Sequence, residues 1–283
     1  MNLLYTERAR SKKLRRFEGH MQTYPPPKSI SKVQIRQEAF DLWLEFVAEM
    51  GVGYVLRHGV DFDDFYDAVL YPKYEITLVA NEDLGVDDDG SQIFGKYLAK
   101  DNTAFVNRKL FDDNDPRKVF TEIHESIGHG VLHGPFLREN AQKYPKLYTT
   151  EDGIGLTGTG TGFNWKQMDT FEWQANAFAV NAFAPRNYVW CLYSKMFDME
   201  RKIRYCGPST YCLVCNGTSY RVFVSSPLQL AWVIAKRMQP YFWGLSAQSL
   251  AYQVLAVAID SNGYSQGGLN NWDSAKSIGE ILS

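Results

Sequence analysis

The chain has 283 residues, of which 45% are hydrophobic and 22% charged, and its net charge is −2. These fractions are ordinary for a soluble globular protein with a sizeable core, and so small a charge argues neither for nor against a nucleic-acid partner. No apolar run approaches the ~18 residues that a membrane span needs, and the N-terminus lacks the apolar segment of a secretory signal. We therefore expect a cytoplasmic protein without a membrane partner.

The first 30 residues show no periodic pattern and contain a basic cluster between Arg8 and Arg16. Three consecutive prolines, 25–27, then mark a stiff linker. Such an arm can touch nucleic acid or an acidic partner. So short a cluster is more typical of a solvated, flexible tail, and we favour that interpretation.

The next segments predict one helix and two strands. A helix is expected from Ser31, which can cap it, to Glu49, with glycines at 51 and 53 ending it. Residues 73–80 and 102–110 are expected to be strands because of their β-branched content and alternation. We expect the second strand to offer a free edge that pairs with an extended peptide, and a plain sheet edge is the alternative.

Residues 115–134 hold three of the five histidines and are patterned as a helix. Asp115 is a good N-cap, and Pro116 suits the first helical position. Apolar residues recur at steps of three and four, which gives the helix one apolar face. Gly134 followed by proline predicts its end.

This predicted helix contains the motif H-E-S-I-G-H, from His124 to His129. A zinc hydrolase needs imidazole ligands and a nearby carboxylate that takes a proton from water, for which Glu125 is the candidate. The usual zinc-binding motif, H-E-x-x-H, places both histidines on one helix face. With one residue more, a regular helix rotates the second histidine by about 140°. A single π-turn would absorb the extra residue, and Gly128 would ease the distortion.

A second ligand pair stays open. His129 and His133 are four residues apart, so they fit a regular helix without a bulge. That pair would leave no glutamate in the usual position after the first histidine. If His133 is not a ligand, we expect it to line the cleft or to orient a ligand.

Residues 170–184 are predicted to form the helix that supplies the third zinc ligand. Glu172 shares a face with Asn176 and with small and apolar residues, where a carboxylate is costly unless it is paired or metal-bound. We choose Glu172 as the ligand and place Asn176 in the cleft or beside the ligands. Other acidic candidates are Asp169, Glu151 and Asp152. The intervening segment, 149–165, is rich in glycine and threonine and predicts a mobile loop near the cleft.

Two segments resemble the ImmA/IrrE-type family of metallopeptidases. F-T-E-I-H-E-S-I-G-H-G-V-L-H is similar to that family's F-T-x-A-H-E-L-G-H-x-L-L-H, with one inserted residue. E-W-Q-A-N-A-F-A-V-N-A-F-A-P is similar to E-x-x-A-N-x-F-A-x-x-L-L-M-P, whose first residue maps onto Glu172. The resemblance covers about residues 35–190, with a weaker match in I-A-K-R-M and S-A-Q-S-L-A-Y-Q-V. The H-E-x-x-x-H spacing itself resembles that of dipeptidyl peptidase III-type enzymes.

The resemblance implies a fold and a substrate class. It implies an α+β fold, a small gluzincin-like metallopeptidase domain over residues 31–190, built of helices and a short mixed or antiparallel sheet. It also implies that Glu172 is a zinc ligand and that the substrate is a protein, often a helix-turn-helix transcriptional repressor. The cysteine-containing segment, 191–226, is not part of the family pattern.

The four cysteines lie close together in that segment, at Cys191, Cys206, Cys212 and Cys215. The spacing of the last three is similar to the halves of a zinc ribbon, and Cys191 would complete a set of four thiolates for a second, structural zinc ion. The first half lacks its C-x-x-C partner. We therefore favour free buried thiols over a structural zinc site. Residues 227–283 are expected to begin with two helices, broken near residue 243, that pack on the same core.

Two hypotheses of function follow. The first is a cytosolic zinc endopeptidase in which His124, His129 and Glu172 hold one catalytic Zn²⁺ and Glu125 is the general base. The second is a non-catalytic regulator that uses a metallopeptidase scaffold to bind a repressor or DNA through the arm and the C-terminal helices. The inserted residue motivates the second hypothesis, because a helix that stayed regular would break the metal site.

Overall fold

The computed structural model describes residues 30–259, except for several short segments (87–89, 91, 114, 116, 142–153, 156–164, 198–203 and 208–209). The basic arm therefore lies outside the described residues, as does most of the loop predicted at 149–165. Within the described part, no helix is long and apolar enough to cross a membrane.

The chain opens with a helical layer that begins where the sequence predicts. The hydroxyl of Ser31 accepts a hydrogen bond from the backbone N–H of Gln34, and the Gln34 side chain accepts one from the N–H of Ser31. This reciprocal cap fixes the start of the first helix, and Gly51 ends it with a positive φ of 83°. The elements of this layer are α2 (Lys32–Met50), α3 (Val52–His58), α4 (Phe62–Phe65), the π-helix η1 (Tyr66–Leu70) and α5 (Tyr71–Tyr74).

A small mixed sheet follows, in the spatial order β1-β3-β2-β4. Its strands are β1 (Thr77–Glu82), β2 (Gly95–Leu98), β3 (Thr103–Asn107) and β4 (Ile154–Gly155). The first strand starts at Thr77, four residues later than the sequence predicts, because Lys73 and Tyr74 still belong to α5. The expectation of a free edge on the second strand is wrong, since β3 pairs in parallel with β1 and antiparallel with β2.

The histidine-containing segment is divided into several helices. They are α6 (Arg108–Asp112), α7 (Lys118–Ile123), the π-helix η2 (His124–Val131) and α8 (Gly134–Ala141). The regular helix α7 begins at Lys118, two residues later than the sequence predicts. The carboxylate of Asp115 nevertheless makes a cap-like contact, accepting the backbone N–H of Arg117 at 2.8 Å, and it pairs with the Arg117 guanidinium. Gly134 does not end the helical segment either, because α8 begins there.

The rest of the chain continues with two long helices, a three-stranded sheet and a C-terminal helical pair. These elements are α10 (Trp165–Phe183), α11 (Arg186–Met196), β5 (Arg204–Gly207), β6 (Thr210–Cys215), β7 (Thr218–Phe223), α12 (Pro227–Met238), the 3-10 helix η3 (Gln239–Tyr241), α13 (Ala247–Val254) and the π-helix η4 (Leu255–Ile259). The sheet is antiparallel throughout, in the order β5-β6-β7. The two helices after residue 227 and the break near residue 243 agree with the sequence prediction.

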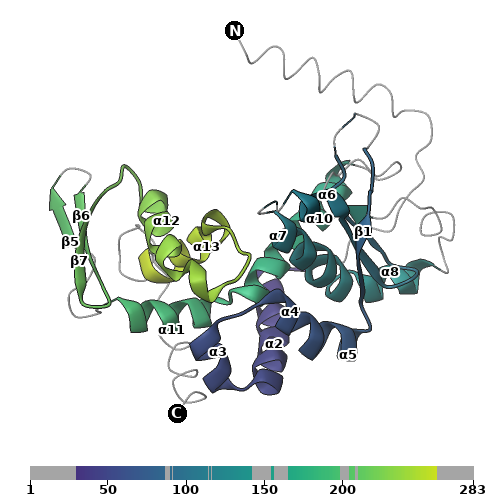
Figure 1. Ribbon diagram of the computed structural model, residues 1–283, viewed down its shortest axis with the longest axis horizontal. Helices are drawn as coiled ribbons and strands as arrows, with labels where there is room; N and C mark the ends of the chain where they lie inside the picture. Colours follow the sequence, from purple (N-terminus) through teal and green to yellow (C-terminus); the bar gives the residue numbers. More distant parts are fainter. Residues whose placement is uncertain are drawn as a thin grey trace, which may run out of the picture.

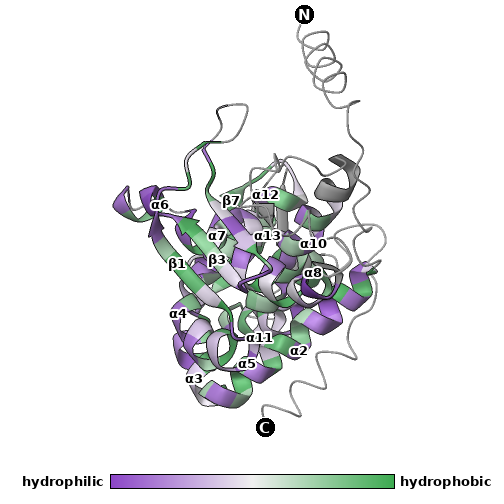
Figure 2. Ribbon diagram, turned by 90° about the vertical axis from the view of Figure 1, so that its right-hand side faces the viewer, coloured by the Kyte–Doolittle hydropathy of each residue, from purple (hydrophilic) through white to green (hydrophobic). Residues whose placement is uncertain are grey.

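One hydrophobic core joins all of these parts. Its buried residues run from Ile30 to Val257 and include side chains of α2, α10, α11, α12 and α13. Figure 1 shows α11, α12, α13 and the three-stranded sheet on the left, β1 with α6, α7, α8 and α10 on the right, and α2 between them. Figure 2 shows the helices banded with hydrophobic and hydrophilic residues, as expected where one helix face packs inward.

Candidate metal centre

The helix changes geometry where the H-E-x-x-x-H motif lies. Residues His124–Val131 form a π-helix, in which each backbone hydrogen bond spans five residues instead of four. The π-turn predicted from the inserted residue is confirmed. The wider turn brings the rings of His124 and His129 face to edge, with centroids 4.7 Å apart. Both histidines and Glu125 between them are fully buried.

Glu172, on α10, brings its carboxylate to both histidines. Nε2 of His124 lies 3.1 Å from one oxygen of Glu172, and Nε2 of His129 lies 3.4 Å from the other. Tetrahedral zinc holds nitrogen and oxygen ligands at about 2.0–2.2 Å, which places any two ligand atoms roughly 3.3–3.5 Å apart. Each histidine nitrogen therefore lies at a ligand-like distance from one oxygen of the Glu172 carboxylate.

The hydrogen bonding of these ligand atoms gives independent support. Nε2 of His124, Nε2 of His129 and Oε1 of Glu172 are buried, and none makes a hydrogen bond with the described residues. Buried polar atoms normally have a hydrogen-bond partner, because moving such an atom out of water without a new partner is unfavourable. In addition, ligand atoms of His124, Glu125 and His129 all lie within 4.8 Å of one another in a buried group that could hold a metal ion.

The protonation states of the cluster suit metal binding. Burial alone would raise the pKa of Glu172, but attraction to the imidazoles of His129 and His124 lowers it to about 2. Burial lowers the pKa of His129, which favours the neutral imidazole. A metal needs an ionised carboxylate and neutral imidazoles as ligands. Burial favours the neutral form of His129, and positive charge beside Glu172, which the protonated imidazoles supply when no metal is bound, favours the ionised carboxylate.

Asn176 orients the first ligand. Its Oδ1 lies 3.1 Å from Nδ1 of His124, and Glu172 stands one turn earlier on the same helix. Because an amide oxygen only accepts, the hydrogen must be on Nδ1 of His124. Nε2 is then left with a lone pair that points toward Glu172. Asn176 therefore lies beside His124, one of the candidate ligands.

A buried relay orients the second ligand. Nδ1 of His129 lies 3.1 Å from Nδ1 of His133, and Nε2 of His133 lies 3.1 Å from Oε1 of Gln174. Gln174 accepts from Nε2–H of His133, so His133 must accept from Nδ1–H of His129. This assigns the lone pair of His129 to Nε2, the atom that faces Glu172. Sequence reasoning missed Gln174.

The relay favours the pair His124 and His129 over the pair His129 and His133. His129 and His133 face each other through Nδ1, and the other nitrogen of His133 is occupied by an amide. The structure thus brings His124, His129 and Glu172 together and places His133 behind His129. Of the other acidic candidates, Glu151 and Asp152 lie outside the described residues, as does the side chain of Asp169.

Two glycines allow the close packing of this centre. A Cβ at Gly128 would lie 2.8 Å from the carbonyl oxygen of Ala175, so the absence of a side chain lets η2 approach α10, which carries Glu172. Close approach to α10 is the role of Gly128 that the structure shows, and it adds to the eased distortion that the sequence suggests. A Cβ at Gly95 would lie 2.7 Å from the side chain of Glu125, so β2 also lies directly against the centre.

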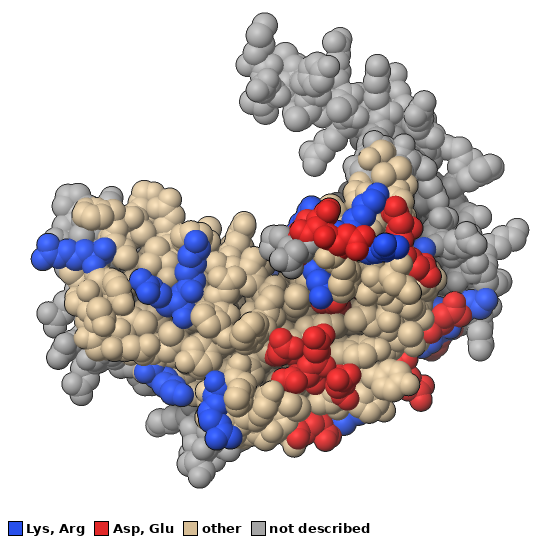
Figure 3. Space-filling model, viewed as in Figure 1, with Lys and Arg blue, Asp and Glu red and all other residues tan. Residues whose placement is uncertain are grey.

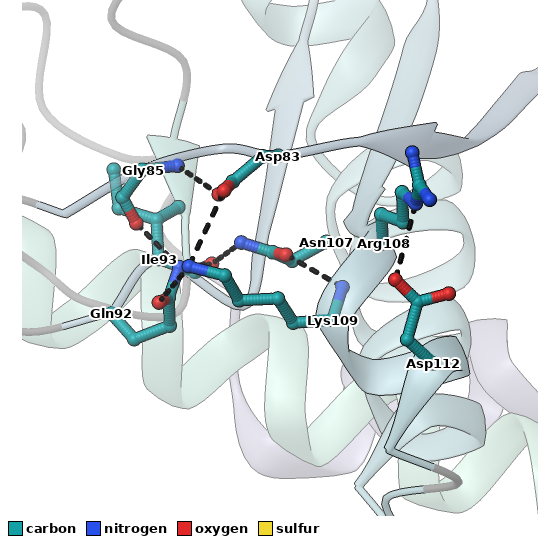
Figure 4. A network of polar contacts seen from close by, with 8 residues as sticks. All are labelled: Asp83, Gly85, Gln92, Ile93, Asn107, Arg108, Lys109 and Asp112. Carbon is teal, nitrogen blue, oxygen red and sulfur yellow. Dashed lines mark hydrogen bonds and ion pairs between the residues drawn. The ribbon is translucent and has the colours of Figure 1, made fainter.

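A polar network holds the loop before β2 in place (Figure 4). Asn107, fully buried at the end of β3, donates from Nδ2 to the carbonyl oxygen of Ile93 at 2.7 Å and accepts the N–H of Lys109 at 2.9 Å. The ammonium of Lys109 lies 3.3 Å from the carboxylate of Asp83 and 3.2 Å from Oε1 of Gln92. These contacts fix the loop that leads into Gly95, and so they position β2 against Glu125.

The cysteines do not assemble as the zinc set that the sequence left open, and they are not all free thiols as we favoured. Cys212 is disulfide-bonded, whereas Cys191 and Cys215 are free. A sulfur in a disulfide is not a thiolate, so a site of four thiolates is not formed in this structure. Burial also raises the pKa of the Cys191 and Cys215 thiols, which favours their protonated form. The side chain of Cys206 lies outside the described residues.

Comparison with known proteins adds no relative to this picture. No protein-family model, curated protein or solved structure matches the chain. The assignment of the metal centre therefore depends on the geometry of its own residues.

Proposed function

We propose that the chain is a zinc-dependent endopeptidase. One observation carries the proposal: the buried Nε2 atoms of His124 and His129, which have no hydrogen-bond partner among the described residues, lie 3.1 and 3.4 Å from the two carboxylate oxygens of Glu172. A general-base candidate, Glu125, follows the first ligand on the same π-helix. Two histidines, one carboxylate and an adjacent glutamate are the donor set of catalytic zinc in peptide hydrolysis.

The residues of the centre divide the chemistry among them. Zinc held here would supply a Lewis acid for the scissile carbonyl and would lower the pKa of a coordinated water toward neutrality. Glu125 takes a proton from the attacking water and delivers it to the amine that leaves. Asn176 and His133 keep the two imidazoles in the tautomer that exposes Nε2. Burial of the histidines limits competing solvent.

The substrate class that we propose comes from the motif resemblance. The histidine motif and the α10 motif are similar to those of ImmA/IrrE-type metallopeptidases, which often cleave helix-turn-helix repressors. We propose a protein substrate of that kind. The alternative of a non-catalytic scaffold was motivated by the inserted residue, which would break the metal site if the helix stayed regular. Because η2 is a π-helix, that motivation does not apply.

A single substitution tests the mechanism. Glu125→Gln keeps the size and polarity of the side chain but removes the base, so the variant should bind zinc as the wild type does and should not cleave. The assay is digestion of a proteome-derived peptide library by zinc-loaded protein, read by mass spectrometry. Retained cleavage by Glu125→Gln would reject the mechanism. Absence of cleavage by zinc-loaded wild type would favour the non-catalytic regulator.

A further inference from the structure

A cleft of about 690 Å³ lies beside the metal centre, between α2, α10 and α13. Two of its lining residues also touch a metal ligand. The ring of Phe120 lies 6.2 Å from the ring of His124, and Asn176 accepts a hydrogen bond from the same histidine. The cleft is therefore separated from His124 by Phe120 and Asn176, and Asn176 contacts the Nδ1 side of that imidazole.

The charged lining of the cleft is entirely basic. Lys32 and Arg36 come from the first two turns of α2, and Arg186 is the first residue of α11. Among the lining residues that the structure describes there is no carboxylate. The other polar members are neutral, namely Asn176, Asn181, Ser246, Gln248, Ser249, Tyr252 and Gln253.

The surroundings strengthen this positive character. Three helices, α2, α11 and α13, begin at the cleft, and helix N-termini carry partial positive charge. Residues 186–259 contain eight lysines and arginines against two acidic residues, in a chain whose net charge is −2. Figure 3 shows that acidic and basic side chains are also separated on one face of the molecule. Acidic side chains gather around α4, and basic ones predominate over α11 and α12.

Two of the cations are available to a ligand. In the part of the chain that the structure describes, neither Lys32 nor Arg36 forms an ion pair, and Lys32 lies over the half-exposed indole of Trp173, with its ammonium 5.7 Å from the ring. Arg186 instead donates to Oε1 of Gln253 at 3.3 Å and so ties α11 to α13. Trp173 and Tyr252, 41% and 56% exposed, add aromatic surface to the same lining.

We propose that this cleft binds an acidic segment of the peptide substrate, so that aspartate or glutamate side chains lie close to the scissile bond. The inference rests on the proposed peptidase function and adds the substrate chemistry. Three cations around a cleft of this size suit a few carboxylates of an extended peptide. The phosphate backbone of a nucleic acid generally requires a longer basic stripe.

Binding is tested with the zinc-loaded Glu125→Gln chain, which leaves the peptide intact. The probes are two fluorescein-labelled decapeptides that differ only in four glutamates replaced by glutamines, read by fluorescence anisotropy. We expect the acidic peptide to bind about ten-fold tighter or better, and to weaken as salt screens the charges. The double change Lys32→Glu with Arg36→Glu should remove this preference. Lys32 is the first residue of its helix and Arg36 is partly exposed, so both changes should leave the fold intact.

A matched control separates the cleft from net charge. Lys100→Glu with Lys195→Glu changes the charge by the same amount at exposed positions outside the cleft, and it should keep the preference. Three results would overturn the proposal. They are equal affinity for the two peptides, a preference for the acidic peptide that survives the change of Lys32 and Arg36, and tighter binding of a thymidine decanucleotide than of the acidic peptide.

Cleavage of the peptide library by wild type distinguishes the two proposals. Cut sites with acidic residues enriched nearby, and with that enrichment lost in the Lys32→Glu and Arg36→Glu variant, support both. Cleavage without any acidic enrichment rejects the cleft assignment alone. Acidic-peptide binding without cleavage at any bond rejects the peptidase and leaves the cleft as a binding site for acidic segments.

Discussion

Nδ1 of His129 lies 3.1 Å from Nδ1 of His133, and this contact fixes which nitrogen of His129 faces Glu172. His133 is fully buried behind the ligand, and its own orientation depends on Gln174. His133 and Gln174 thus determine the tautomer of His129, a candidate metal ligand.

Removing this relay should weaken metal binding. We expect His133→Ala and Gln174→Leu each to raise the zinc dissociation constant by about 10- to 100-fold, because an orienting partner of a ligand typically has that effect. The measurement is competition with a chromogenic chelator, alongside chemical denaturation to follow stability. His58→Ala, at an exposed histidine on α3, is the control. An unchanged dissociation constant in both relay variants would show that His133 only fills space.

Gly128 should be intolerant of even one methyl group. The Cβ of Gly128→Ala would lie 2.8 Å from a backbone oxygen of α10, which cannot rotate away. We expect a loss of about 1–3 kcal/mol in the free energy of unfolding and a lower zinc affinity, since η2 and α10 must separate. Gly53→Ala, in the helix α3, meets nothing closer than 4.0 Å and should be neutral or stabilising. Equal effects of the two changes would contradict this account of the packing.

Glu122 should make the metal-free protein less stable at alkaline pH. It is 4% exposed on α7, and burial raises its pKa from 4.5 to about 7. The folded protein therefore binds this proton more tightly than the unfolded chain, so the associated stability is present below about pH 4.5 and is lost as pH rises to about 7. Glu122→Gln should be more stable than wild type at pH 8, by at most about 3 kcal/mol.

That pH effect is measured by denaturant unfolding at pH 5 and pH 8 in the presence of a chelator, so that no metal contributes. The difference between variant and wild type should be larger at pH 8 than at pH 5. The same difference at both values would mean that Glu122 does not titrate in this range.

Local patterns were enough to predict much of the centre. The inserted residue of H-E-x-x-x-H required a π-turn, and the structure has one at His124–Val131. The position of Glu172 on one face of a predicted helix identified the carboxylate that lies between the histidines. Both inferences use spacing within a single helix, which sequence reports directly.

The features that were missed depend on contacts between distant segments. The interior position of β3 arises because Thr77 pairs with Thr103 in parallel, which no local pattern indicates. Gln174 gains its role only because α10 lies beside His133.

Metal content per chain tests the central claim most directly. Purified wild type, reconstituted with zinc and passed through a desalting column, should hold one zinc ion by plasma mass spectrometry. His124→Ala and Glu172→Ala should hold almost none, while His58→Ala and Glu82→Ala, at exposed positions, should match wild type. Zinc retained in both site variants, or none in wild type after reconstitution, would contradict a centre formed by His124, His129 and Glu172.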